Sequence, residues 1–209
     1  MSLGAPPSPA HLRRQALAAK VSQPDRLPAQ TALLLIDLQK AFDDPAWGRR
    51  NNPGAEAVAA RLLEAWRAQG RPIIHVQHLS TEAESSYRPG QAGCDFKDEV
   101  LPRAGEIVVQ KQTNSAFIET GLSALLQDKG IATLVVGGVI TNNSVEATVR
   151  MAGNLGYRTY LVADATATVD TLDLEGRLWD ADEVQALTLA NLDGEYATVT
   201  NSATILDAL

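Results

Sequence analysis

The chain has 209 residues, 45% of them hydrophobic, which is enough to build a sizeable core in a single large domain. Its net charge of -7, with no basic run longer than a pair, argues against sequence-independent binding to the phosphate backbone of nucleic acid. Because Cys94 is the only cysteine, the chain can form neither an intrachain disulfide nor a zinc site built from several cysteines. No apolar run approaches the ~20 residues that span a bilayer. We therefore expect a cytoplasmic protein without nucleic acid or membrane partners.

The first 30 residues differ in composition from the rest of the chain. Residues 1–10 are rich in proline, and residues 11–30 form a polar stretch that includes Pro28. We expect an N-terminal arm over 1–30 and one domain over 31–209. An arm of this length usually packs against something, and a second subunit is one candidate.

From residue 31, short apolar runs alternate with amphipathic segments. The predicted strands are 32–37, 72–78, 106–111, 132–139, 158–164 and 196–200. The predicted helices are 54–69, 118–129, 143–155 and 180–192, each with a glycine at or near its end. Continuous rather than alternating apolarity is typical of strands covered on both faces. The sequence therefore predicts a three-layer α/β/α sandwich with a six-stranded parallel sheet.

The stretch 79–105 has no hydrophobic period and contains several glycine, proline and serine residues. A connection of this length in a compact domain is usually functional. We expect it to form a lid or a wall of a site.

Three candidate functional residues follow or end predicted strands, namely Asp37, Lys111 and Ser144. Taken singly, each has an ordinary structural explanation: a turn aspartate, a solvated lysine and a serine in the first turn of a helix. However, ligands of parallel sheets bind beyond the carboxyl ends of the strands, and neighbouring strands lie ~4.8 Å apart. Three reactive or charged side chains at one edge therefore predict a site there.

The motifs LLLIDLQKAF, KQTNSAF and GVITNNSVEATVRMAGNLGY occur in this order, within a resemblance that covers essentially residues 31–200. They resemble the isochorismatase-like hydrolase superfamily, also called the cysteine hydrolase family, which includes nicotinamidases and ureidoacrylate amidohydrolase. The resemblance implies Asp37 as general base, Lys111 as its charged partner and position 144 as the nucleophile. It also implies a cis peptide at Val139-Ile140, an oxyanion hole formed by the N–H groups of Ile140 and Ser144, and a homo-oligomer.

Ser144 departs from the family, which usually has cysteine at this position. A thiol at a helix N-terminus beside a lysine is stabilised as a thiolate, whereas a serine hydroxyl needs a base to remove its proton. Three interpretations remain open: a natural replacement, an engineered substitution, or a site that no longer catalyses a reaction. True isochorismatases provide a precedent for the first, since they lack the cysteine and cleave a vinyl ether with the aspartate as acid.

Six neighbouring residues are candidate substrate contacts: Gln39, Phe42, Trp47, Asn114, Ser115 and Phe117. The resemblance places Gln39, Phe42 and Phe117 at the pocket floor, with ordinary packing as the alternative. The residues Asn114 and Ser115 are expected to cap the helix beginning near 118, and either could also touch substrate. Two interpretations of Trp47 remain open: its side chain lines a wall of the pocket, or it lies at an interface.

No metal or organic cofactor is expected. His75 and His78 lie three apart on a predicted strand, so their side chains face opposite sides and cannot bind one ion together. His78, at the end of the strand, is a candidate substrate contact, with a structural role as the alternative. Gly137-Gly138 lacks the G-x-G-x-x-G spacing of a dinucleotide loop.

The expected function is hydrolysis of a small molecule, most simply at a C-N amide-type bond. The alternatives are a vinyl-ether hydrolase without a covalent intermediate, an inactive protein that binds a ligand in the pocket, and an interaction protein assembled through its N-terminal arm.

Overall fold

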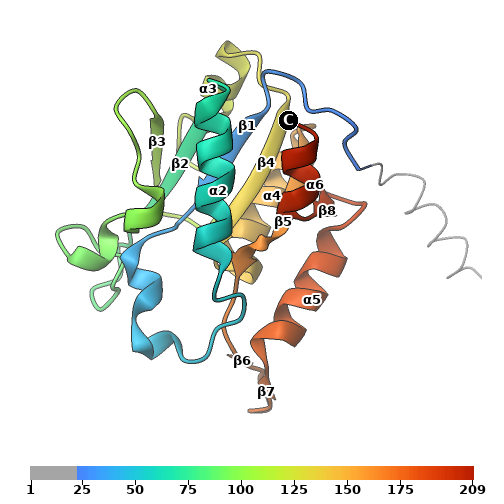
Figure 1. Cartoon of the computed structure of the whole chain (residues 1–209). Helices are drawn as coiled ribbons and strands as arrows, with labels where there is room; N and C mark the ends of the chain where they lie inside the picture. Colours follow the sequence, from blue (N-terminus) through green and yellow to red (C-terminus); the bar gives the residue numbers. More distant parts are fainter. Residues whose placement is uncertain (1–22) are drawn as a thin grey trace, which may run out of the picture.

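Six parallel strands form the central sheet in this computed structural model, which describes residues 23–209. They are β1 (Ala32–Ile36), β2 (Ile73–His78), β3 (Ile107–Lys111), β4 (Thr133–Val139), β5 (Arg158–Ala167) and β8 (Thr198–Thr200). The strand order is β3-β2-β1-β4-β5-β8, and every neighbouring pair is parallel (Figure 1). This confirms the predicted sheet and places β1 and β4 at its centre.

Helices cover both faces of the sheet, because alternate side chains of each strand point to opposite sides. On one side, Leu33 and Leu35 join a core shared with α2 (Ala55–Ala68) and α6 (Ser202–Asp207). On the other side, Leu34 and Ile36 join a core shared with α3 (Leu122–Asp128), α4 (Glu146–Asn154) and α5 (Ala181–Leu192). The predicted three-layer α/β/α sandwich is confirmed.

Several short elements connect these layers. The 3-10 turns are η1 (Lys40–Asp43), η2 (Pro45–Trp47), η3 (Ala92–Cys94) and η4 (Asp98–Val100), and a π-helical turn, η5 (Thr141–Val145), follows β4. An antiparallel hairpin of β6 (Thr171–Leu172) and β7 (Leu178–Trp179) extends from the body of the protein (Figure 1). Neither this hairpin nor α6 was predicted from the sequence.

The helix predicted from residue 118 begins only at Leu122. Glu119 has a φ of 54°, which no helix accommodates, and the Thr120 hydroxyl accepts a hydrogen bond from the Leu122 N–H. The prediction that Asn114 and Ser115 cap this helix is therefore wrong. The Ser115 hydroxyl instead accepts a hydrogen bond from the N–H of Phe117 at 3.3 Å.

A close approach between the two central strands requires glycine at position 138. Gly138 has a φ of 133°, and a Cβ there would lie 2.1 Å from the backbone oxygen of Ile36. A β-bulge lies beside it, between Val136 and Gly138. This contact brings the turn that follows β4 next to the end of β1.

The described part of the N-terminal segment packs against its own domain. Leu27 is buried and donates its N–H to the Ala208 carbonyl at 2.8 Å, and Arg71 donates to the Pro28 carbonyl at 2.7 Å. The predicted arm over 1–30 otherwise lies outside the described residues. Within residues 23–209, no helix is both long and apolar enough to cross a membrane.

Candidate active site

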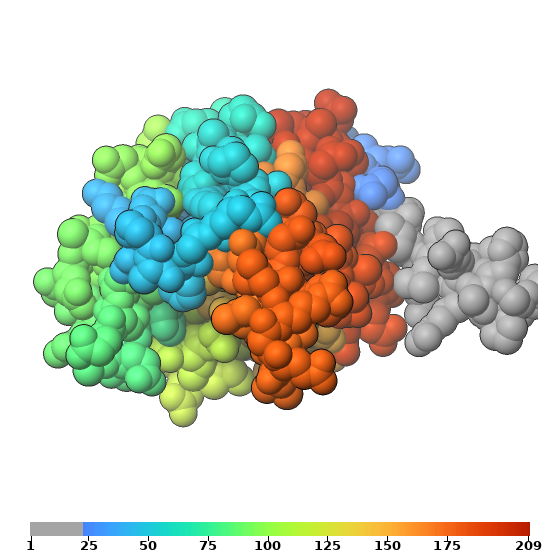
Figure 2. Space-filling view, turned by 90° about the horizontal axis from the view of Figure 1, so that it is seen from below, coloured from blue at the N-terminus to red at the C-terminus, as the bar shows by residue number. Residues whose placement is uncertain are grey.

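The carboxyl edge of the sheet gathers segments that are far apart in the chain. Figure 2 looks onto this edge, where the segment after β1 (light blue), the loop between β2 and β3 (green) and the segment after β5 (orange) lie side by side. Asp37 follows β1, Lys111 ends β3, and Ser144 lies in η5 after β4. Because β2 separates β1 from β3, the side chain of Lys111 reaches past a strand to approach Asp37.

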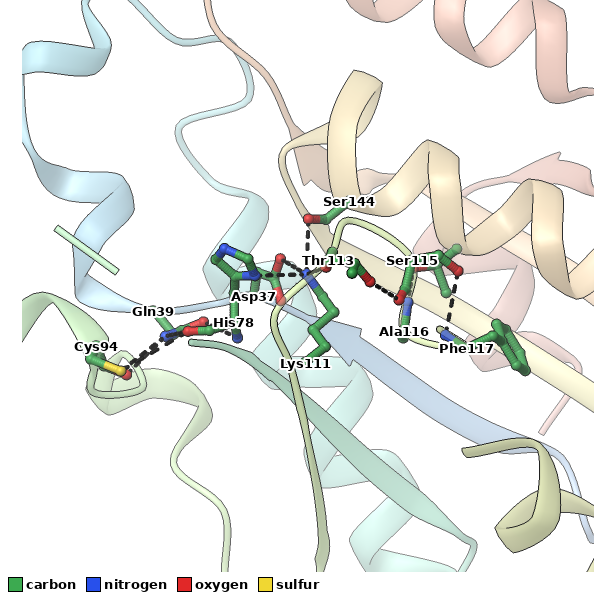
Figure 3. A network of polar contacts seen from close by, with 11 residues as sticks. Asp37, Gln39, His78, Cys94, Lys111, Thr113, Ser115, Ala116, Phe117 and Ser144 are labelled. Carbon is green, nitrogen blue, oxygen red and sulfur yellow. Dashed lines mark hydrogen bonds and ion pairs between the residues drawn. The ribbon is translucent and has the colours of Figure 1, made fainter. Parts of the chain in front are cut away.

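The ammonium group of Lys111 is the centre of a buried hydrogen-bond network (Figure 3). Its Nζ donates to Asp37 Oδ2 at 2.7 Å, to Ser144 Oγ at 3.0 Å and to the Thr113 carbonyl at 3.1 Å. The Nδ1 atom of His78 lies 3.4 Å away. An ammonium has only three N–H donors, so the His78 contact is the weakest of the four. The structure thus brings Asp37, Lys111 and Ser144 together.

Asp37 is in an unusual electrostatic and conformational state. It is 4% exposed, and its Oδ1 has no hydrogen-bond partner among the described residues. Burial raises the pKa of the carboxyl, while the charge and hydrogen bond of Lys111 and the Ser144 hydroxyl act in the opposite direction. The backbone φ of 52° lies in the left-handed region, where strain is concentrated at functional sites. One carboxylate oxygen is therefore buried without a hydrogen-bond partner among the described residues.

The turn that carries Ser144 is held in place by polar contacts. The peptide bond between Val139 and Ile140 is cis, as the resemblance implied. The Thr141 hydroxyl donates to Gln185 Oε1 at 2.8 Å, which fixes the start of the turn. Within residues 23–209, the N–H group of Ile140, which directly precedes this turn, donates to no backbone acceptor outside helices and strands.

The Gln39 side chain is fully buried and bonds to the backbone at both ends of its amide. Its Nε2 donates to the carbonyls of His78 at 3.0 Å and Cys94 at 2.9 Å, and its Oε1 accepts from the His78 N–H at 2.8 Å. This amide therefore fixes the end of β2 and the loop beyond it.

His78 is half-buried at the end of β2. Burial and the nearby charge of Lys111 lower its pKa to about 4, so the imidazole is neutral at pH 7. His75 faces a different environment, with its Nε2 2.8 Å from Glu106 Oε2. The two histidines therefore have separate partners, and the described residues contain no group of three or more His, Cys, Asp or Glu side chains suited to a metal ion.

A row of aromatic rings leads from η1 to His78. The rings of Phe42 and Trp47 are 6.3 Å apart, those of Trp47 and Tyr87 are 6.3 Å apart, and those of Tyr87 and His78 are 5.7 Å apart. The guanidinium of Arg50 lies 4.5 Å from the centre of the Phe42 ring. Tyr87 belongs to the stretch 79–105 that was expected to form a wall, but nothing in the sequence singled out this residue.

The remaining predicted contacts lie away from this network. Asn114 is exposed, and the Ser115 hydroxyl is engaged with the Phe117 backbone. The ring of Phe117 stacks on Tyr157 at 5.7 Å and is directed away from Lys111 (Figure 3). Phe117 therefore belongs to the core beneath α4 in this structure.

Comparisons with known proteins identify the family. Residues 31–204 match the isochorismatase domain. The chain is 41% identical over 168 residues to the uncharacterized isochorismatase family protein YrdC of Bacillus subtilis, covering 80% of this chain and 90% of that protein. It is 30% identical to the ureidoacrylate amidohydrolase RutB of Serratia proteamaculans, covering 74% of this chain and 80% of that protein. A crystal structure of an isochorismatase-family protein from Chromobacterium violaceum superimposes with a TM-score of 0.87 at 58% identity, covering 90% of this chain and 97% of the other. The chain belongs to the isochorismatase family of hydrolases.

Proposed function

We propose that the protein hydrolyses a C-N amide-type bond of a small molecule, with Asp37, Lys111 and Ser144 as its catalytic residues. The observation that carries this proposal is that one buried ammonium group hydrogen-bonds both Asp37 Oδ2 and Ser144 Oγ. A relative named as an amidohydrolase, ureidoacrylate amidohydrolase, supports the choice of bond.

Asp37 is the proton carrier in this proposal. Its pKa is raised by burial, which brings the carboxyl closer to the working pH that suits a general acid or base. The unpartnered Oδ1 is the atom that receives the proton. Lys111 holds the other oxygen and keeps the carboxyl oriented.

Ser144 is the nucleophile in this proposal. Because its Oγ accepts a hydrogen bond from Lys111, its own proton remains free to pass to Asp37. The Oγ attacks the carbonyl carbon, and the N–H groups of Ile140 and Ser144 stabilise the oxyanion. The amine leaves with the proton from Asp37, and water then hydrolyses the ester.

A second candidate is cleavage of a vinyl ether by water without a covalent intermediate. The observation that favours it is also the burial of Asp37, because a raised pKa lets the carboxyl act as an acid. In an inactive, ligand-binding member, neither reaction would occur although the pocket still binds small molecules.

A hydrolysis screen tests these functions. The protein is incubated with small amides, ureido compounds and vinyl ethers, and products are identified by mass spectrometry. Turnover by the wild type that is lost in Asp37→Asn and kept in Asp95→Asn, an exposed aspartate, supports the proposal. If Ser144→Ala loses amide cleavage, the result supports covalent attack by Ser144 Oγ. If Ser144→Ala keeps amide cleavage, the result supports direct attack by water. If the wild type cleaves none of these compounds, the result contradicts the proposed hydrolase activity.

The cellular setting is proposed as well. We propose a cytoplasmic homo-oligomer that acts on a small-molecule substrate. The single, buried cysteine suits a reducing compartment. Because residues 23–30 contact their own domain, the test for an assembly role of the arm is removal of residues 1–22, followed by mass measurement in solution.

A further inference from the structure

We propose that Tyr87 and His78 are specificity-determining residues, forming an uncharged donor pair that selects substrates with a neutral hydrogen-bond acceptor beside the scissile bond over substrates with a carboxylate there. This inference rests on the proposed site but concerns ligand selection rather than turnover. The argument starts from the tautomer of His78.

The neighbouring ammonium determines which nitrogen of His78 carries the proton. Lys111 Nζ lies 3.4 Å from His78 Nδ1, and a proton on Nδ1 would face this cation, which has no acceptor to receive it. The lone pair of the neutral imidazole therefore faces Lys111, and the proton is on Nε2. Gln39 fixes the backbone of His78 through two hydrogen bonds, so the ring is held in a defined place. Within the described residues, no partner is found for Nε2, so its N–H is available to a ligand.

Tyr87 provides the second donor. The residue is 6% exposed, and its ring packs edge-on against His78 and Trp47. Burial, followed by the charge of Asp37, raises the pKa of the phenol, so the hydroxyl stays protonated at neutral pH. In the part of the chain that the structure describes, this hydroxyl forms no hydrogen bond.

Hydrogen bonds within the segment from Ser80 to Tyr87 hold the loop that carries Tyr87. Ser80 donates its N–H to the Tyr87 carbonyl at 3.2 Å, and Tyr87 donates its own N–H to the Ser85 hydroxyl at 3.2 Å. Gly93 packs so closely on this segment that a Cβ there would lie 2.3 Å from the Ser86 carbonyl. The phenol is therefore positioned by its own loop.

The cations around this wall already have partners. Lys111 pairs with Asp37 at 2.7 Å, and Arg50 and Lys97 each pair with Glu56 at 2.7 Å. An incoming carboxylate would thus meet neutral donors and the charge of Asp37, and a buried charge without a counter-ion is strongly disfavoured. A carbonyl or ether oxygen accepts from the same donors without that cost.

The test compares the binding of two matched probes, malonamide and malonamate, by isothermal titration calorimetry. Both carry the same amide, and beside it malonamide has a neutral carbonyl where malonamate has a carboxylate. The wild type is expected to bind malonamide at least about 10-fold more tightly than malonamate. Tyr87→Phe, which keeps the ring, is expected to weaken malonamide binding roughly 3- to 10-fold. Tyr157→Phe, at the ring that stacks on Phe117 away from the site, is the matched control and is expected to bind like the wild type.

Equal or tighter binding of malonamate by the wild type overturns the proposal, as does the absence of malonamide binding at millimolar concentration. Unchanged malonamide binding in Tyr87→Phe overturns the role of the hydroxyl. The wild-type comparison does not depend on any variant folding. Since the readout is affinity rather than product formation, an inactive protein with the expected preference contradicts only the proposed function.

Discussion

Lys111 Nζ lies 2.7 Å from Asp37 Oδ2, although the two residues are 74 positions apart and come from strands that are not neighbours. Their side chains are 0% and 5% exposed. Each charge is thus stable in the interior because the other is present, and each residue is expected to be sensitive to loss of its partner.

Replacement of Lys111 by methionine is expected to abolish hydrolysis and to lower the free energy of unfolding by about 3–5 kcal/mol, because it leaves a buried carboxyl without its cation. Urea denaturation measures the change. Lys40→Met is the control, since the Lys40–Asp98 pair at 3.0 Å is exposed and should change stability by no more than about 1 kcal/mol. The Asp37→Asn/Lys111→Met double variant should recover part of the lost stability. A single Lys111→Met variant as stable as the wild type would show that the pair is not coupled in this way.

Replacement of Ser144 by cysteine is expected to create a reactive thiol. The introduced sulfur would lie near the Lys111 ammonium and in η5, directly before the N-terminus of α4, and both stabilise a thiolate. Iodoacetamide labelling followed by intact mass should show one modification at pH 7. The wild type serves as control, because its buried Cys94, whose pKa is raised by burial, should remain unmodified. An unlabelled Ser144→Cys variant would indicate that the site does not activate a nucleophile.

The pKa of His78 predicts a dependence of stability on pH. In the folded protein this pKa is about 4, whereas an unfolded histidine has a pKa of about 6.5. Between these values the unfolded chain binds a proton that the folded protein does not. The stabilising contribution is therefore present above about pH 6.5 and is lost as the pH falls toward 4.

The half-exposed position of His78 reduces the size of this effect to roughly 1–2 kcal/mol. The measurement is urea denaturation at several pH values for the wild type and His78→Gln. The difference in stability between the two proteins should change across this range. A constant difference would mean that the folded and unfolded pKa values of His78 are equal.

Gly138→Ala is expected to prevent stable folding, because the new Cβ would lie 2.1 Å from the Ile36 carbonyl oxygen and the φ of 133° disfavours a side chain. Gly54→Ala is the matched control, since among residues 23–209 no atom beyond its chain neighbours lies within 4 Å of its Cβ position. The expected change there is within about 0.5 kcal/mol. Thermal unfolding followed by circular dichroism compares the two, and similar melting temperatures would contradict the close contact between β1 and β4.

The sequence was sufficient to predict the sheet and the three residues at its edge, because both depend on strong local signals. Continuous apolar runs mark the strands, and parallel strands bring their carboxyl ends to one side. The helix 180–192 was also close to the observed α5, where Asp180 and Glu183 form a capping box.

The features that were missed depend on tertiary contacts. Nothing in an aperiodic loop shows that Tyr87 will lie beside His78, because that contact depends on the packing of Gly93 against residue 86. The amide of Gln39 matches a pocket residue by motif, yet its partners are backbone atoms 39 and 55 positions away. The hairpin of β6 and β7 has strands of only two residues each, which is too short for a periodic signal.

The most direct test of the central claim is the kcat/KM of the wild type, Asp37→Asn and Asp95→Asn on one amide substrate identified by the screen, with folding verified by melting temperature. If Asp37 carries the proton, kcat/KM should fall at least roughly 1,000-fold in Asp37→Asn and stay unchanged in Asp95→Asn. A folded Asp37→Asn variant that keeps the wild-type kcat/KM would contradict the assignment of the active site.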